Sequence, residues 1–325
     1  MLKKKIWMPL VAGLMLAASV QAQTFPTKPI KLIIPFPPGG TTDIVGRIVA
    51  DKLGKELGQP VIVENKGGGG GSIGADAIAK SAPDGYTIGI ATVSTHAVNA
   101  ACNPKLTYDP IKDFVPITNL AHTPNVLTVN PKFPAKNFPE FLAYIKKNPG
   151  KVAYATSGTC GIAHMIGEQF KASTGTFILH IPYRGSGPAL NDVLGGQVET
   201  MFDNLPSSAS YIQTGRLRAM AVAWKTRLDT MPTVPTFAEL GLKEVNDPAW
   251  YGLVAPAKTP DDIVRKIHAA AVKVLALPEV RERFKAGGAE PIGNTPAEFG
   301  IEIKKEYDKM KSLVKTQNIK FEGGG

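Results

Sequence analysis

The stretch Leu32–Leu53 reads LIIPFPPGGTTDIVGRIVADKL and joins three features in one unit. An apolar run typical of a buried strand ends in Pro-Pro-Gly-Gly, and Thr-Thr-Asp then opens an amphipathic helix. Proteins use a strand, a glycine turn and a helix N-terminus to bind small anions, because backbone N–H groups and the helix dipole face the turn. The stretch therefore predicts the first unit of an α/β fold, with an anion site at its turn.

Short strands and helices alternate beyond this unit. Strand patterns lie at 60–65, 86–93, 125–130, 151–156, 177–183 and 216–224, and helix patterns at 73–81, 137–150, 162–173, 187–196, 259–277 and 295–316. This alternation predicts doubly wound, mainly parallel sheets flanked by helices. We expect two domains, with residues 23–120 and 224–322 in domain 1 and residues 121–223 in domain 2.

The first residues resemble an export signal. Residues 1–22 combine three lysines, an apolar run and a small-residue end, which predicts a secretory signal peptide cleaved after Ala22. A membrane anchor needs about 20 continuous apolar residues, and the run here is shorter and contains Pro9. We therefore expect a periplasmic protein.

The distribution of charge argues against a nucleic acid partner. The chain of 325 residues has a formal net charge of +10, and its basic residues are scattered. Nucleic-acid-binding domains instead cluster lysine and arginine on one face. We expect no nucleic acid partner, and we expect a monomer.

Few residues suit catalysis, a cofactor or a metal. The run Gly67–Gly71 matches a dinucleotide fingerprint only because consecutive glycines match almost any glycine pattern, so we interpret it as a flexible turn and expect no cofactor. The five histidines are spread singly, which predicts no metal site. Ser186 lacks the first glycine of a nucleophile elbow, because Arg184 stands there.

The two cysteines leave two questions open. Cys160 and His164 are four residues apart, so a secreted enzyme with a thiol–imidazole pair is one alternative function. Cys102 and Cys160 form either a disulfide, which an oxidising compartment permits, or two separate thiols. A bridge between the domains would restrain their relative motion unless it lay at the hinge.

Four loops rich in glycine, serine and threonine each precede a helix. They read PPGGTTD, TVSTHAVN, TSGTCGIAH and YRGSGPAL. Such loops offer backbone N–H groups, hydroxyl donors and the positive ends of helices, which suit a carboxylate. Because the loops of α/β sheets gather at the carboxyl edge of the strands, we expect a ligand between the two domains.

Nine segments in order carry a family resemblance. They are PIKLIIPFPPGGTTDIVGR, APDGYTIGIAT, YDPIKDFVPIT, VLTVNPKFPAKNFPEFLAYIKKNPGKVAYATSG, HIPYRGSGPALNDVLGGQVETMFDNLP, GRLRAMAV, PTVPTFAELG, WYGLVAPAKTP and GGAEPIGNTPAEF. Together they resemble the Bug-type extracytoplasmic solute receptors of tripartite tricarboxylate transporters. The resemblance implies a periplasmic binding protein of type II, a Venus flytrap with its ligand in the cleft.

The resemblance also implies a set of ligand-binding residues. They are Phe36, Gly40, Thr41, Thr42, Asp43, Ser94, His96, Asn99, Ser157, Gly158, Thr159, His164, Tyr183, Gly185, Ser186, Ala189 and Asp203. Asp43 is expected to orient the first loop or to cap the helix, since it would repel a carboxylate, and Asp203 is expected to close the pocket. Cys160 and the loops TVSTHAVN and YRGSGPA depart from the commoner family forms, which leaves the identity of the carboxylate open.

The function expected from these features is capture of a small organic carboxylate and its delivery to the permease subunits of a membrane transporter. Dicarboxylates, tricarboxylates, amino acids and aromatic acids such as terephthalate or nicotinate all fit. We expect no catalytic residue. A ligand-sensing partner of a membrane kinase is the second alternative.

Overall fold

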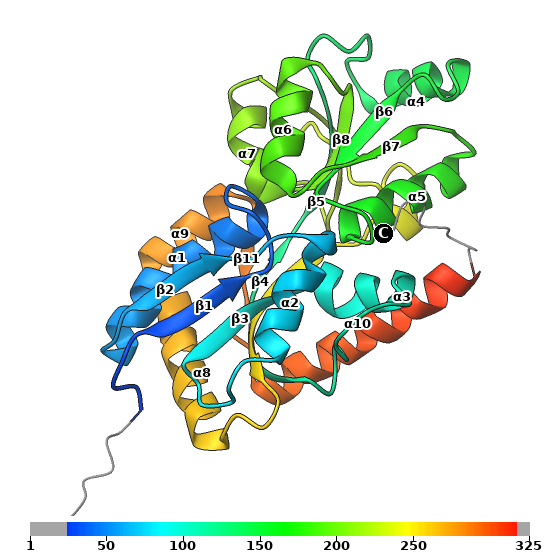
Figure 1. Ribbon diagram of the computed structural model, residues 1–325. Helices are drawn as coiled ribbons and strands as arrows, with labels where there is room; N and C mark the ends of the chain where they lie inside the picture. The colour runs from blue at the N-terminus through cyan, green and yellow to red at the C-terminus, as the bar shows by residue number, and fades with distance from the viewer. Residues whose placement is uncertain (1–24, 317–325) are drawn as a thin grey trace, which may run out of the picture.

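The computed structural model describes residues 25–316 and contains two sheets in two lobes (Figure 1). Lobe 1 is built on six strands in the order β11-β4-β10-β3-β1-β2: Glu290–Pro291, Phe114–Thr123, Ala249–Pro256, Thr87–Thr92, Ile30–Ile34 and Val61–Asn65. Lobe 2 is built on five in the order β7-β6-β8-β5-β9: Leu179–Pro182, Ala153–Thr156, Thr200–Asn204, Asn125–Val129 and Arg218–Ala223.

Helices cover the sheets of both lobes. In lobe 1 they are α1 Thr41–Leu57, α2 Ser72–Ala79, α3 Asn99–Cys102, α8 Asp261–Ala276, α9 Pro278–Ala286 and α10 Pro296–Thr316, and a π-helical turn, η2, spans Ser94–Val98. In lobe 2 they are α4 Phe138–Lys147, α5 Ile162–Thr174, α6 Ser186–Gly195 and α7 Leu205–Gln213. Figure 1 shows α6 and α7 on one side of the second sheet and α5 on the other.

The opening stretch of sequence folds as its pattern predicts. Four of the five residues of β1 are buried, and α1 begins at Thr41, after the glycine turn. Apolar side chains at helical spacing bury one face of α1, and Gly58 ends it with φ of +73°, a conformation that glycine adopts without strain. The turn therefore lies at the carboxyl end of β1, where it faces lobe 2.

The sheets are mixed rather than mainly parallel, which corrects the prediction. β1 pairs in parallel with β2 and β3, and β6 with β7 and β8. β10 is antiparallel to β3 and β4, because it returns the chain from lobe 2, and β5 is antiparallel to β8 and β9. β4, β8 and β10 were not predicted; all residues of β8 and β10 are buried, which leaves no alternation to detect.

The chain crosses between the lobes twice. It passes from β4 to β5 at Pro124, and it returns in the connector 224–248. Phe237 of this connector packs against Phe138 and Phe170 of lobe 2. We therefore propose a division into two domains whose second boundary lies near Ala249 rather than at residue 223.

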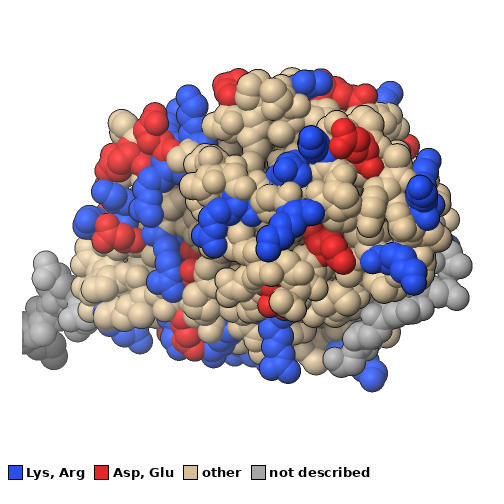
Figure 2. Space-filling model, turned by 90° about the horizontal axis from the view of Figure 1, so that it is seen from above, with Lys and Arg blue, Asp and Glu red and all other residues tan. Residues whose placement is uncertain are grey.

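Two further features concern the chain ends and the surface. The predicted signal peptide lies outside the described residues, and within 25–316 no helix combines the length and the hydropathy needed to cross a membrane. Figure 2 shows one face of the molecule, where basic side chains lie among acidic and uncharged ones. On this face the positive charge is spread out rather than gathered into one surface.

Candidate functional site

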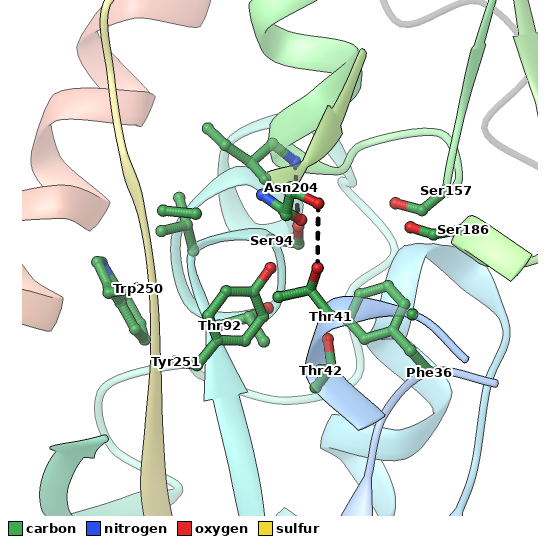
Figure 3. Close-up of a pocket in the computed structure, with 14 residues that line it drawn as sticks. Phe36, Thr41, Thr42, Thr92, Ser94, Ser157, Ser186, Asn204, Trp250 and Tyr251 are labelled. Carbon is green, nitrogen blue, oxygen red and sulfur yellow. Dashed lines mark hydrogen bonds between the residues drawn. The ribbon is translucent and has the colours of Figure 1, made fainter. Parts of the chain in front are cut away.

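A small cavity lies between the two lobes, where the predicted loops meet (Figure 3). Its volume, measured as the space open to the centre of a water molecule, is about 20 Å³. Its lining residues are Phe36, Gly40, Thr41, Thr42, Thr92, Val93, Ser94, Ser157, Ile162, Ser186, Asn204, Ala249, Trp250 and Tyr251. Seven of these belong to the predicted set: Phe36, Gly40, Thr41, Thr42, Ser94, Ser157 and Ser186.

Two helix N-termini face each other across this cavity. A Cβ atom placed on Gly40, before α1, would lie 3.6 Å from Cβ of Ser186, the first residue of α6. Neither helix has a side-chain cap. Among the described residues, the amides of Thr41, Thr42, Ser186 and Gly187 have no hydrogen-bond acceptor. The cavity therefore collects N–H donors and the positive ends of two helix dipoles.

Direct hydrogen bonds join the lobes beside these helix ends. The amide of Ile162, at the start of α5, donates to Oγ of Ser94, 3.0 Å away. Thr41 Oγ1 lies 3.0 Å from Oγ of Ser207 and 3.2 Å from the carbonyl oxygen of Asn204, to which it donates (Figure 3). Because these hydrogen bonds join the two lobes directly, the lobes are closed against each other.

The cavity wall has no charged side chain among the described residues that form it. Its one titratable group is Tyr251, and burial, with a smaller effect of the nearby Asp203 carboxylate, raises the pKa of this phenol well above its usual value. In Figure 3, Tyr251 points toward Thr41, while Trp250 lies on the other side of β10. The groups available to a ligand are neutral donors, so a bound carboxylate would be held by backbone amides and hydroxyls.

Asp203 lies behind the cavity wall and does not line the cavity, which corrects its predicted position. Its buried carboxylate accepts hydrogen bonds from Ser186, Ser207 and Ser208 at 2.9, 2.7 and 2.5 Å. Burial raises its pKa, although the three hydroxyls and a backbone amide oppose that rise. Asp203 therefore orients the Ser186 hydroxyl and joins α6 to α7.

Asp43 is also outside the cavity. It accepts hydrogen bonds from the amide of Gly39 at 3.1 Å, Nε of Arg47 at 2.8 Å and Nδ2 of Asn65 at 2.9 Å. These contacts hold the glycine turn against β2 and α1. The geometry is that of a residue that orients the loop.

Three other predicted residues lie in the protein interior, apart from the cavity. His96 is fully buried, with Nδ1 2.9 Å from Thr95 Oγ1, and burial lowers its pKa to about 3. His164 stacks on His180 with ring centroids 3.7 Å apart and accepts a hydrogen bond from the amide of Cys160. Ala189 belongs to the apolar core of lobe 2. These side chains support the loops from behind, because each helix turns only part of its residues toward the cleft.

A larger groove adjoins the cavity, and Phe36 and Ser157 line both. By the same measure its volume is about 730 Å³. The remaining predicted residues lie in its wall: Asn99, Gly158, Thr159, Tyr183 and Gly185. The run Gly68–Gly71 of lobe 1 lines the groove as well.

The glycine run makes a close contact between the lobes, which corrects its interpretation as a flexible turn. Gly70 has φ of +62°, and a Cβ atom on it would lie 2.4 Å from the carbonyl oxygen of Thr159 in lobe 2. A real Cβ atom does not approach an oxygen so closely. Glycine is therefore required here by backbone conformation and by space.

A disulfide joins the two lobes at this groove. Cys102, the last residue of α3 in lobe 1, is bonded to Cys160 in the loop before α5 of lobe 2, with Cα atoms 6.0 Å apart. Both cysteines line the groove and neither lies in the segments that cross between the lobes. With its sulfur in this bond, Cys160 has no thiolate to act as a nucleophile.

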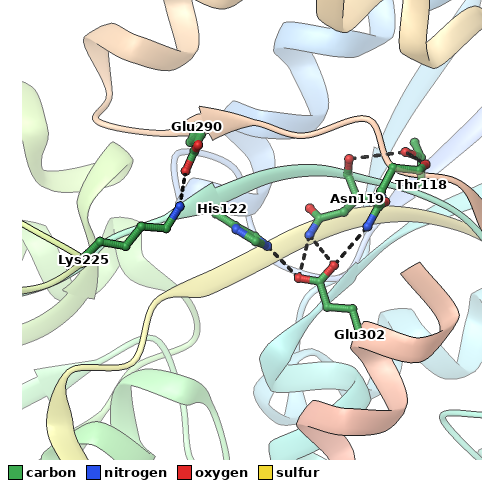
Figure 4. Close-up of polar contacts among 7 residues, drawn as sticks. Thr118, Asn119, His122, Lys225, Glu290 and Glu302 are labelled. Carbon is green, nitrogen blue, oxygen red and sulfur yellow. Dashed lines mark hydrogen bonds and ion pairs between the residues drawn. The ribbon is translucent and has the colours of Figure 1, made fainter. Parts of the chain in front are cut away.

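β4, the strand that leads to the first crossing at Pro124, is held to α10 by a polar cluster (Figure 4). Glu302 of α10 accepts from Nδ2 of Asn119 at 2.9 Å, and its Oε1 lies 2.6 Å from Nε2 of His122, both on β4. Burial acts to raise the pKa of Glu302, but the hydrogen bonds from His122 and Asn119 lower it overall. An ion pair between Lys225 and Glu290, 3.0 Å apart, links the returning connector to β11.

Seven lining residues of the cavity were not predicted: Thr92, Val93, Ile162, Asn204, Ala249, Trp250 and Tyr251. Thr92 and Ile162 lie in loops that were singled out, TVSTHAVN and TSGTCGIAH, so the loops were a usable signal. Ala249–Tyr251 come from β10, whose segment WYGLVAPAKTP contributed to the family resemblance but to none of the expected ligand-binding residues. Within residues 25–316 no group of three His, Cys, Asp or Glu side chains is arranged to hold a metal ion.

Comparison with known proteins agrees with this architecture. Residues 45–319 match the model of the tripartite tricarboxylate transporter family receptor. Protein BugT of Bordetella pertussis is 39% identical over 307 residues, which are 94% of each chain. A solved structure titled as a periplasmic transporter is 58% identical with a TM-score of 0.91, over 92% of this chain and all of that one.

Two similar structures contain ligands. MatC from Rhodopseudomonas palustris, with bound malate, is 32% identical with a TM-score of 0.85, over 89% of this chain and 100% of that one. Rpa4515 from R. palustris, with adipate, is 32% identical with a TM-score of 0.88, over 91% of this chain and 99% of that one. With a family model that matches most of its length, this chain belongs to the receptors of the tripartite tricarboxylate transporter family, the Bug-type solute-binding proteins of Venus-flytrap fold.

Proposed function

We propose that this protein binds a small organic carboxylate in the cavity between its lobes, in the periplasm, and delivers it to a membrane permease. The observation that carries this proposal is the pair of uncapped helix N-termini, α1 and α6, that face each other across a cavity without a charged wall. Aligned N–H donors at helix starts favour an anion. Gly40, Thr41, Thr42 and Ser186 are its proposed binding residues, with Ser94 and Ser157 beside them.

The chemistry of the ligand is supported by the relatives. Malate and adipate, found in MatC and Rpa4515, are both dicarboxylates. We propose a dicarboxylate as the ligand class. A ligand that contacts both lobes stabilises the closed arrangement by its higher affinity for that arrangement, which is how a flytrap receptor signals that it is loaded.

A receptor is favoured over an enzyme by the state of the candidate nucleophile. The sulfur of Cys160 is in the disulfide, and His164 is buried behind its loop rather than in the cavity. A sensory partner would bind its ligand in the same way. We propose transport because the family is one of transporter receptors.

A thermal shift panel tests the ligand class. A ligand at 100 times its Kd stabilises the folded state by about 2.7 kcal/mol, which raises Tm by roughly 5 °C for a chain of this size. We expect one or a few dicarboxylates to produce this shift, and their diamides and dimethyl esters to produce none. A shift from a sugar or an amine, with every carboxylate inactive, contradicts the proposal. Analysis of the recovered ligand is expected to show it unchanged, since a new product would indicate an enzyme.

A further inference from the structure

We propose that the groove beside the cavity binds a second anionic group of an elongated ligand, with Arg184 and Lys105 as its positive partners. This inference rests on the proposed function, because the first carboxylate is the one bound at the helix ends of α1 and α6. The site then holds two anionic groups, and Arg184 and Lys105 select for the second.

The sizes of the two spaces support this division. A space of about 10–15 Å³ holds one water molecule, so the cavity of about 20 Å³ has room for little more than the head of a ligand. The groove is open to about 730 Å³, and Phe36 and Ser157 line both spaces. A ligand with its first carboxylate in the cavity therefore extends past Phe36 into the groove.

Part of the groove wall suits an apolar chain or ring. Phe36, Pro37 and Ile73 line it from lobe 1, and Tyr183 lines it from lobe 2. The hydroxyl of Tyr183 already donates to Asp192, 2.6 Å away, so this residue offers its ring rather than a polar group. Methylene groups or an aromatic ring would lose water contact against these side chains, which favours binding.

The charged side chains of the groove are both basic. Arg184 follows β7 of lobe 2, and Lys105 follows α3 of lobe 1, so the two come from opposite sides. Both are exposed, and neither side chain has a hydrogen bond or an ion pair with any other described residue. No aspartate or glutamate lies among the residues that line the groove. Two unpaired cations without a local carboxylate attract an anion, and arginine binds a carboxylate with two parallel hydrogen bonds.

Asn99 is a second, independent indication of a ligand. This residue is fully buried and lines the groove, and its Nδ2 donates to the carbonyl oxygens of Gly70 and Ser94. Its Oδ1 has no hydrogen-bond partner among the described residues. An unsatisfied buried acceptor is costly, so a ligand donor that reaches Oδ1, such as a hydroxyl, would stabilise the site.

The disulfide joins the two walls of the groove that carry the cations. Cys102 is three residues before Lys105, and its partner Cys160 is in the loop that borders the groove from lobe 2. The bond keeps the two walls of the groove together, so that Lys105 and Arg184 face the same space from two lobes.

The test compares ligands that differ only in the second carboxylate. Kd is measured by titration calorimetry for succinate and butyrate, adipate and hexanoate, and terephthalate and benzoate. The wild type is expected to bind at least one dicarboxylate about tenfold or more tightly than its monocarboxylate partner. Arg184→Ala and Lys105→Ala are each expected to weaken that dicarboxylate by roughly three- to tenfold and the monocarboxylate by less than about twofold. Arg281→Ala, which removes an equal charge from the exposed surface of α9, is expected to change neither.

The outcomes separate this inference from the proposed function. If the wild type binds no carboxylate of the panel, the proposed function fails, and this inference fails with it. If the wild type binds monocarboxylates and dicarboxylates equally, or if Arg184→Ala and Lys105→Ala leave the preference unchanged, the inference is overturned and the carboxylate site at the helix ends stands. If Arg281→Ala reduces the preference as much as they do, the effect is one of net charge and the groove is not the site.

Discussion

Replacing both cysteines by serine removes the disulfide that joins the lobes in addition to the two crossings of the chain. The bond closes a loop between residues 58 apart in sequence. In the chain-entropy description, a loop of that length lowers the entropy of the unfolded chain by about 14 cal/mol/K, or about 4 kcal/mol at 25 °C. The Cys102→Ser/Cys160→Ser variant is therefore expected to lose about 4 kcal/mol of unfolding free energy, which is roughly 6 °C in Tm.

The same variant reports on lobe motion. The bond lies at the groove and away from the crossing segments, so it limits how far the lobes separate. We expect the variant to have a larger radius of gyration than the oxidised wild type in solution scattering without ligand. A saturating dicarboxylate is expected to bring the two radii together, because the ligand closes the lobes.

Two controls test the disulfide and its effect on Tm and on the radius of gyration. Peptide mapping without reduction is expected to find Cys102 linked to Cys160, and wild type treated with a reductant is expected to resemble the variant in both Tm and radius. An oxidised wild type whose Tm and radius equal those of the variant would refute the restraint. Unlinked cysteines in the untreated protein would refute the bond itself.

Three further predictions concern single positions. Gly40→Val places two methyl groups between α1 and Ser186, and valine tolerates the φ of −86° at this position. Calorimetry should therefore show at least about tenfold weaker carboxylate binding, while Tm stays near normal. Unchanged affinity would place the anion elsewhere. Gly70→Ala should lower Tm more than Gly215→Ala, because both have positive φ but only the former meets a carbonyl oxygen of the other lobe; equal losses would exclude the clash. Glu302, whose pKa is lowered on folding, stabilises the protein above its unfolded pKa and loses that effect as pH falls. The stability of Glu302→Gln should therefore fall less steeply than that of wild type in acid denaturation below about pH 5, and parallel curves would contradict this.

Local patterns in the sequence were sufficient for most units of the fold, although they missed β4, β8 and β10. The strand, turn and helix of 30–57 depend on apolar periodicity and on glycine and threonine at the turn, and all of these act between neighbours in the chain. The loops that meet at the cleft were found for the same reason, because their donors precede helices. The family resemblance, confirmed by the comparisons, then supplied the flytrap arrangement.

Only the tertiary structure decided which side chains face the ligand space. Asp203 of β8 and His96 of the loop TVSTHAVN lie behind the wall because of their packing, while Tyr251 enters the cavity from β10, where no ligand-binding residue was expected. The bond between Cys102 and Cys160 depends on a distance between two lobes, which spacing along the chain does not determine. Periodicity specifies the face of an element, but the rotation of that element against its neighbours is set by long-range packing, and a site between two lobes depends on that rotation.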